Sequence, residues 1–189
     1  PAGVRALSLR AALADNPALA QRMNNEGASA FLALNTALLQ DGAYIHVDAD
    51  TKLTKPLHLV FRNSGNAQIR NLVILEPGAG LSLLESHAGL AKAEYFVNLA
   101  TDVQLAEGAR LSHYRDQAEG LGALHFHYLN ATLASRSYYD GFTLTRGARL
   151  SRNEAHMAIL GSNVHCSLNG VNMQSGGQVC DTTCVMAHM

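Results

Sequence analysis

Three phrases of the sequence are nearly identical at their start: GAGLSLLESH at 78–87, GARLSHYRDQ at 108–117 and GARLSRNEAH at 147–156. Glycine suits a corner of the backbone, and the small alanine after it packs inside a tight bend. The leucine two residues later points to the same side as the alanine and fills the interior. The repeat therefore predicts successive corners of a coiled chain. It also places Leu83, His113 and Arg152 at equivalent positions, where the three copies diverge.

Similar glycines at Gly42 and Gly176 extend the pattern, at uneven steps of about 29 to 39 residues. The segments between them are short, rich in β-branched and aromatic residues, and cut by Gly, Asn and Asp, as strands are. They are AYIHVDAD (43–50), LHLVF (57–61), LVIL (72–75), EYFVNLATDVQL (94–105), LHFHYLNATLA (124–134) and YYDGFTLT (138–145). A β-propeller needs a steadier period, whereas a parallel β-helix tolerates uneven coils. We therefore predict a mainly β protein built as a right-handed parallel β-helix, a solenoid.

The first 40 residues have a different, helical pattern, with apolar residues at steps of three and four. Asn16 and Pro17 are placed to end one helix and start the next, and a third helix is expected from Ser29 to Leu39. The predicted organisation is a short N-terminal α-helical region at 1–40 and a β-helix core at 41–189.

Composition excludes several classes of function. The net charge is −1 and the largest basic cluster is Lys52 with Lys55, so nucleic acid is not an expected partner. No apolar stretch is long enough to span a membrane, and no export signal is visible. Three cysteines, Cys166, Cys180 and Cys184, form no disulfide framework, which suits a reducing cytoplasm. Only 15 % of residues are charged, which favours a surface covered by a partner.

Cys180, Cys184 and His188 are the weak metal candidates, because thiolates and imidazoles bind zinc or iron–sulfur centres. Four-residue steps share one face of a strand but span about 13 Å, too far for one ion. The cysteines are therefore expected to be structural. His125 and His127 also share a face; they either share a metal or form a polar outer face beside Leu124 and Phe126. We favour the outer face.

Arg152 and Glu154 share a face and are expected to form a structural ion pair that orients neighbouring strands. The nucleophile elbow Gly-x-Ser-x-Gly and the phosphate-binding P-loop are both absent. We therefore expect no enzymatic activity from this chain, and any chemistry to be assembled with partners.

The last third contains a longer phrase, SRNEAHMAILGSNVHCSLNGVNMQSGGQVCDTTCVMAH at 151–188. Its ordered skeleton resembles the core of the SufB/SufD family of iron–sulfur cluster assembly proteins, and is closer to SufD. The earlier phrase LNTALLQDGAYIHV…KPLHLVF (34–61) is similar to that family's entry into its β-helix. The motif-matched residues, whose roles the pattern does not define, are Arg152, Asn153, Glu154, Gly161, Asn169, Gly170, Asp181 and His188.

The resemblance implies a cytoplasmic scaffold subunit that supports iron acquisition and nascent cluster formation. Its implied partners are a SufB-like subunit in a heterodimer and a SufC-type ATPase, with a homodimer expected in isolation. The cluster would belong to the complex, and no cofactor is expected on this chain alone. Family members continue beyond the position of His188, so we expect this chain to lack a C-terminal part that holds the cluster-forming residues and the ATPase contact.

The alternative is a β-helix that cleaves or binds polysaccharide. Such enzymes line one outer face with carboxylates, but the aspartates here, Asp48, Asp50, Asp102, Asp116, Asp140 and Asp181, do not recur at equivalent repeat positions. Tryptophan, which stacks on sugars, is absent.

Overall fold

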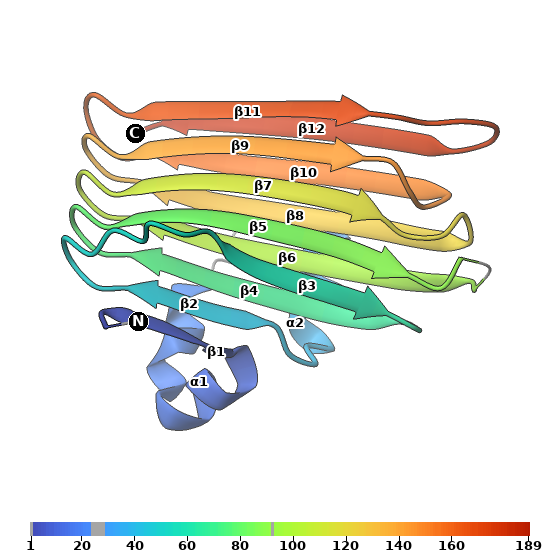
Figure 1. Ribbon diagram of the computed structural model, residues 1–189, viewed down its shortest axis with the longest axis horizontal. Helices are drawn as coiled ribbons and strands as arrows, with labels where there is room; N and C mark the ends of the chain where they lie inside the picture. The colour runs from blue at the N-terminus through green and yellow to red at the C-terminus, as the bar shows by residue number, and fades with distance from the viewer. Residues whose placement is uncertain (1, 24–28, 92) are drawn as a thin grey trace.

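The computed structural model describes residues 2–23, 29–91 and 93–189. The chain alternates between two sheets that face each other, so that successive strands stack into a solenoid (Figure 1). The first sheet, in spatial order, contains β1 (Val4–Ser8), β2 (Ala43–Val47), β4 (Ala67–Leu75), β6 (Tyr95–Leu105), β8 (Ala123–Leu133), β10 (Leu150–Ile159) and β12 (Val179–His188). The second contains β11 (His165–Asn172), β9 (Tyr138–Thr145), β7 (Arg110–Ala118), β5 (Gly80–Gly89) and β3 (Leu57–Asn63). The predicted mainly β, parallel solenoid is confirmed.

The strand register is continuous from coil to coil. Val73 pairs with Val103, Val103 with Ala131, Ala131 with Met157 and Met157 with Met186. Equivalent residues therefore stack directly above one another, at steps of about 26 to 30 residues. All pairs are parallel except the first, because β1 runs antiparallel to β2.

The interior between the sheets has an apolar half. Here, Val73, Val103, Leu81 and Leu111 belong to one buried cluster that also includes Tyr139. Val73 and Val103 are near the ends of β4 and β6, and Leu81 and Leu111 are near the starts of β5 and β7. The corners that connect these strands are on the left in Figure 1. Their burial is the main stabilising contribution, since each fully buried aliphatic side chain contributes about 1.5–3 kcal/mol.

The repeat phrases mark corners, but they do not all mark the same corner. The glycines of the first two, Gly78 and Gly108, have φ of +70° and +67°, and Leu83 pairs with His113 in the second sheet. The third phrase enters β10 of the first sheet, where Arg152 pairs with Phe126. The predicted equivalence of Arg152 with Leu83 and His113 is therefore wrong. Each coil has two corners, and similar turn sequences occur at both.

The N-terminal region combines a strand with three short helical segments: α1 (Leu9–Asp15), the 3₁₀ helix η1 (Pro17–Arg22) and α2 (Ala30–Ala37). As predicted, the Asn16 side chain caps η1 by accepting from the amide of Ala18 at 3.2 Å. Ser29 caps α2 in the same way. The first residues form β1 instead of a longer helix, because they complete the edge of the sheet beside β2.

Helix α2 packs on the outer face of the first sheet. The buried Asn35 amide donates to the carbonyls of Ile69 at 2.9 Å and Asn98 at 2.8 Å. Arg70 lies beneath this helix and pairs with Asp102 at 2.8 Å, with both side chains almost fully buried. Polar contacts therefore fix the helical region to the solenoid.

Candidate functional site

The other half of the solenoid interior is polar. Ionisable and amide side chains from β5, β7, β8 and β10, and from the connection after β7, converge there in place of aliphatic residues. The buried members are Glu85, His87, His113, Arg115, Gln117, Glu119, His125, His127 and Ser151. They lie where the strands of the second sheet end and those of the first begin. We call this set the polar interior.

Glu85 is the centre of one group in the polar interior. Its carboxylate contacts His113 Nε2 at 3.1 Å and His87 Nε2 at 3.2 Å, and Arg115 Nε lies 3.7 Å away. His113 Nδ1 in turn contacts the Tyr139 hydroxyl at 3.0 Å. These contacts join three adjacent strands of the second sheet, β5, β7 and β9.

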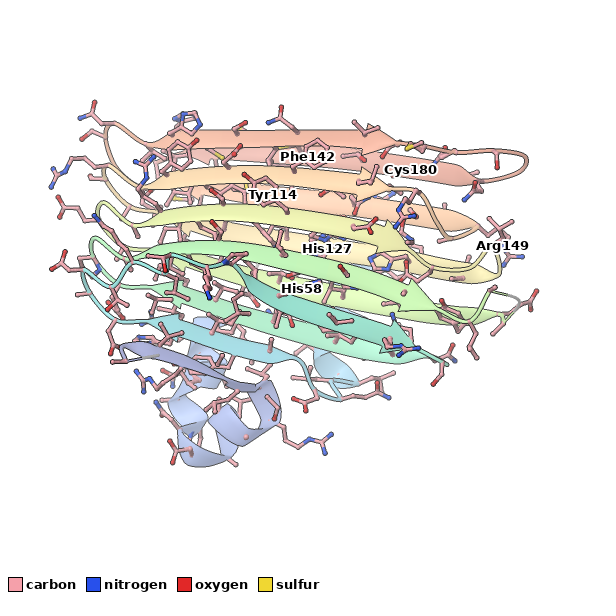
Figure 2. All side chains as sticks on the ribbon, in the orientation of Figure 1. His58, Tyr114, His127, Phe142, Arg149 and Cys180 are labelled. Atoms are coloured by element: carbon pink, nitrogen blue, oxygen red, sulfur yellow. The ribbon has the colours of Figure 1, made fainter. Side chains whose placement is uncertain are left out.

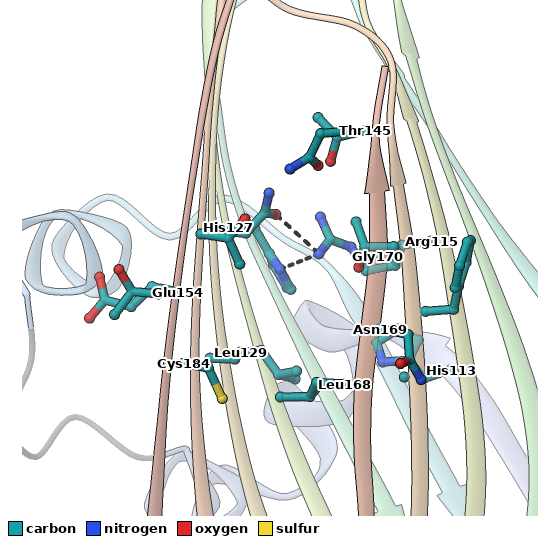
Figure 3. Close-up of a pocket in the computed structure, with 18 of the residues that line it drawn as sticks. His113, Arg115, His127, Leu129, Thr145, Glu154, Leu168, Asn169, Gly170 and Cys184 are labelled. Carbon is teal, nitrogen blue, oxygen red and sulfur yellow. Dashed lines mark hydrogen bonds between the residues drawn. The ribbon is translucent and has the colours of Figure 1, made fainter. Parts of the chain in front are cut away.

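Arg115 reaches across the interior to the first sheet (Figure 3). Its guanidinium hydrogen-bonds to His127 Nδ1 and to Asn153 Oδ1, the latter at 3.4 Å. His127 Nε2 lies 3.2 Å from the hydroxyl of Thr101. A buried charge is thus held by polar partners on both sheets, as a low-dielectric site requires.

Glu119 and His125 form the second group. Glu119 Oε1 lies 2.8 Å from His125 Nδ1, and its other oxygen accepts from the Gln117 amide. Gln117 also accepts from Ser151 at 3.1 Å.

Burial and neighbouring charges shift the pKa values of several members. Burial raises the pKa of Glu85 and Glu119, but their histidine partners outweigh it: the pKa of Glu85 is well below its usual range and that of Glu119 is about 2. Burial lowers the pKa of His87 and, together with the Arg115 charge, lowers that of His127 further. The two carboxylates are therefore ionised at neutral pH, while His87 and His127 are neutral.

A cavity of about 250 Å³ opens between the last coils, next to the polar interior. Arg115 and His127 lie on its polar side, and Leu129, Leu168 and Cys184 lie on its apolar side (Figure 3). Burial raises the pKa of the nearby Cys166 thiol to about 11, so this cysteine is a neutral, weakly nucleophilic group at neutral pH.

Cys180, Cys184 and His188 all lie on β12. Cys180 pairs with Ser151, Cys184 with Ala155 and His188 with Ile159 on the neighbouring strand β10, so the three residues lie at separate positions along β12. Among the described residues, the His, Cys, Asp and Glu side chains close enough to hold one ion are His87, Glu119 and His125. The expectation that the two β12 cysteines are structural stays a prediction.

The motif-matched residues are divided between two environments. Arg152 and Asp181 lie on the partly exposed outer face, where their side chains pair across β10 and β12 at 2.6 Å. Arg152 also lies 3.7 Å from Glu154. Asn153, between them, points inward and contacts Arg115. Because side chains alternate between the two faces of a strand, Asn153 lies on the opposite face of β10 from Arg152 and Glu154.

The other motif-matched residues lie at close approaches or on the exposed last strands. A Cβ at Gly161 would lie 2.5 Å from the amide nitrogen of Ser135, and one at Gly170 would lie 3.1 Å from the Thr143 carbonyl. Asn169 is exposed and donates to Ser167 at 2.7 Å, and His188 ends β12.

The expectation that His125 and His127 form an outer face is wrong. Both point inward and are 0 % and 3 % exposed, whereas Phe126 packs on the outer side against Phe31. The apolar Phe126 faces outward because α2 covers that face of the sheet. Glu85, Arg115 and Glu119 were not among the predicted site residues. For Glu85 and Arg115 the available signal was the alternation in LLESH (83–87) and HYRDQ (113–117), which places them on the same face as Leu83 and His113. Glu119 follows β7, outside both segments.

Two family models together match the whole chain. Residues 60–189 match the model described as SUF system FeS cluster assembly, SufBD core domain, and residues 1–59 match the SufBD protein N-terminal region. A parallel solenoid preceded by a helical region is thus the architecture of a SufBD protein, and this chain belongs to the SufBD family.

Individual relatives agree with this assignment. The chain is 27 % identical to the iron–sulfur cluster assembly SufBD family protein slr0076 of Synechocystis, over 86 % of its length and 39 % of that protein. It is 25 % identical to the iron–sulfur cluster assembly protein SufD of Escherichia coli, over 85 % of its length and 40 % of SufD. The chloroplastic protein ABCI7 of Arabidopsis thaliana is 22 % identical over 84 % of this chain. The chain spans about two fifths of the length of these relatives.

Within the described residues, no helix has the length and apolarity needed to cross a membrane. Cys166, Cys180 and Cys184 are all free thiols.

Proposed function

We propose that this chain is part of a non-catalytic scaffold subunit that assembles iron–sulfur clusters in the cytoplasm. The observation that carries the proposal is that the two SufBD family models together cover residues 1–59 and 60–189, in chain order. Relatives named for iron–sulfur cluster assembly support it over more than four fifths of the chain.

The arrangement of the side chains favours a scaffold. The ionisable residues of the polar interior are enclosed between the sheets and bonded to one another, so they rigidify the solenoid. The iron–sulfur cluster is then cargo, built where this subunit meets its partners.

The proposed partners are a SufB-like subunit, in a heterodimer, and a SufC-type ATPase. Support for these partners comes from the match to the SufBD core model and from the relative named SufD. The outer faces of the two sheets offer a large surface for such contacts (Figure 1).

Polysaccharide cleavage finds less support. A carbohydrate-active β-helix needs accessible carboxylates grouped on one outer face. Here, the partly exposed Asp116 and Asp181 are each paired with an arginine, Arg146 and Arg152 respectively.

Co-expression tests the proposal. The full-length protein with an affinity tag is produced with the SufB-type and SufC-type proteins of the same genome. We expect all three to co-purify at a fixed ratio, with ATP hydrolysis only in preparations that contain the SufC-type protein. Recovery of the tagged protein without the SufB-type and SufC-type proteins contradicts the proposal.

A further inference from the structure

Three ligand groups converge inside the solenoid from segments far apart in the sequence. His87 lies on β5, Glu119 follows β7 and His125 lies on β8, and one ligand atom of each lies within 4.8 Å of the others. All three residues are at most 3 % exposed. Two imidazoles and one carboxylate are a ligand set that suits divalent zinc, iron and related first-row ions.

His87 has an unused nitrogen in this site. Its Nε2 lies 3.2 Å from an oxygen of the Glu85 carboxyl group, which orients the ring. Its Nδ1 is buried without a hydrogen-bond partner among the described residues. Histidines that bind metals typically donate their second ring nitrogen to a carboxylate in this way.

The His87 ring is also held in place. It stacks on Phe61 with the ring centroids 4.7 Å apart and the planes 6° from parallel. The His87 and His125 rings pack in an edge-to-face arrangement, with their centroids 5.2 Å apart. Packing on one face and a carboxylate at Nε2 together preorganise the ring.

His125 and Glu119 complete the set. His125 Nδ1 and Glu119 Oε1 are 2.8 Å apart, and a cation placed between them and His87 would replace the proton that they share. Glu119 is further oriented by the amides of Gln117 and Asn63.

We propose that His87, Glu119 and His125 bind one divalent first-row transition-metal ion, of the zinc or ferrous type, inside the solenoid. The ion joins two neighbouring coils and both sheets, and so stabilises the stack. Ligands on one zinc ion lie about 2.0–2.2 Å from it, so binding draws the three groups together by a small rotation of their side chains. This site does not depend on the proposed role in cluster assembly.

Cobalt(II) is the probe. The full-length protein, freed of metal by a chelator, is titrated anaerobically with Co²⁺ and monitored by visible and near-ultraviolet absorbance. We expect visible d–d bands that saturate at one ion per chain, without the thiolate-to-cobalt charge-transfer band that cysteine ligands produce. Addition of Zn²⁺ should abolish these bands and raise the thermal unfolding midpoint.

Variants assign the bands to these side chains. Glu119→Gln and His125→Gln should each lose the d–d bands and the thermal shift produced by Zn²⁺. His127→Gln is the matched control, because it changes a second buried histidine of the same strand; it should retain both responses. Cys180→Ser combined with Cys184→Ser should also retain them.

Wild-type protein that gives no saturable d–d bands overturns the proposal, and this measurement does not depend on the folding of any variant. Bands that persist in folded His125→Gln, or that disappear with the two cysteines, overturn it as well. Circular dichroism before each titration identifies the folded variants.

Discussion

At the scale of single residues, the exposure of an ion pair to water decides how much the pair contributes to the stability of the fold. Arg70–Asp102 and Arg146–Asp116 have the same closest separation, 2.8 Å, but the first pair is buried and the second is about half exposed. An exposed pair contributes little because water and salt screen it, whereas a buried charge left alone is strongly destabilising.

Asp102→Ala should therefore lower the free energy of unfolding by about 3–5 kcal/mol, because it leaves the Arg70 guanidinium buried without its main anionic partner. Asp116→Ala, the control, should cost below about 1 kcal/mol. Urea unfolding of the two variants in parallel measures both. Equal losses would show that α2 does not shield Arg70 from water.

Acid should destabilise the metal-free protein in two stages. Burial and the Arg115 charge hold the pKa of His127 well below 6.5, so the unfolded chain binds a proton that the folded chain does not. Stability is then lost as the pH falls below about 6.5, at up to about 1.4 kcal/mol per pH unit for this group. The lowered pKa of Glu119 adds a second loss, which extends from about 4.5 down to about 2.

His127→Gln should be less stable than the wild type at pH 7.5, yet lose less stability between pH 7 and pH 5. The measurement is the urea midpoint at each pH. A slope unchanged by His127→Gln would mean that this ring is protonated in the folded state.

At the scale of elements, the attachment of α2 depends on Asn35. Asn35→Ala removes a buried amide that serves two backbone carbonyls of neighbouring strands, at a cost of about 1–3 kcal/mol. Asn169→Ala, the same change at an exposed motif residue, should be close to neutral. Chemical denaturation of both variants checks the difference, and similar losses would contradict the docking role of Asn35.

Two of the corners use glycine to adopt a positive φ, whereas Asp50, Arg136 and Asn163 adopt a similar φ of +57° to +59°. Gly108 has φ of +67°, and a Cβ there would have room, with Gly78 N as its nearest contact at 4.0 Å. Gly108→Ala should therefore cost about 1–2 kcal/mol through backbone strain alone. Gly65→Ala, where φ is not positive and no described atom lies within 4 Å, should cost less, and thermal unfolding compares the two.

The strands and helices could be predicted from the sequence better than the connections between them. Alternation in segments such as 94–105 and 138–145 predicted strands, and Asn16-Pro17 predicted a helix start, because these signals are local. Which corner Gly147 forms depends on where the chain arrives from, which is not local. His125 and His127 were assigned to the wrong face for a similar reason: Phe126 is apolar, but α2 gives it an outer surface to pack against.

At the scale of the whole molecule, each coil contacts mainly its two neighbours, as in other solenoids. The strands in the middle of the stack, β6 and β8, pair on both sides, whereas β12 pairs only with β10 among the described strands. Amide hydrogen exchange of the 189-residue chain should therefore be slowest in β6 and β8 and fastest in β12. Uniform protection across the sheets would indicate one cooperative unit instead of stacked coils.

The interior is divided into an apolar half and a polar half, and different contacts hold the two sheets together in each. The apolar half is held by contacts that protons do not alter. The polar half depends on carboxylates and neutral histidines, whose protonation acid changes. Mild acid should thus increase amide hydrogen exchange around His127, in the polar half, before it does so in the apolar half. The chain connections at both edges keep the two sheets joined throughout.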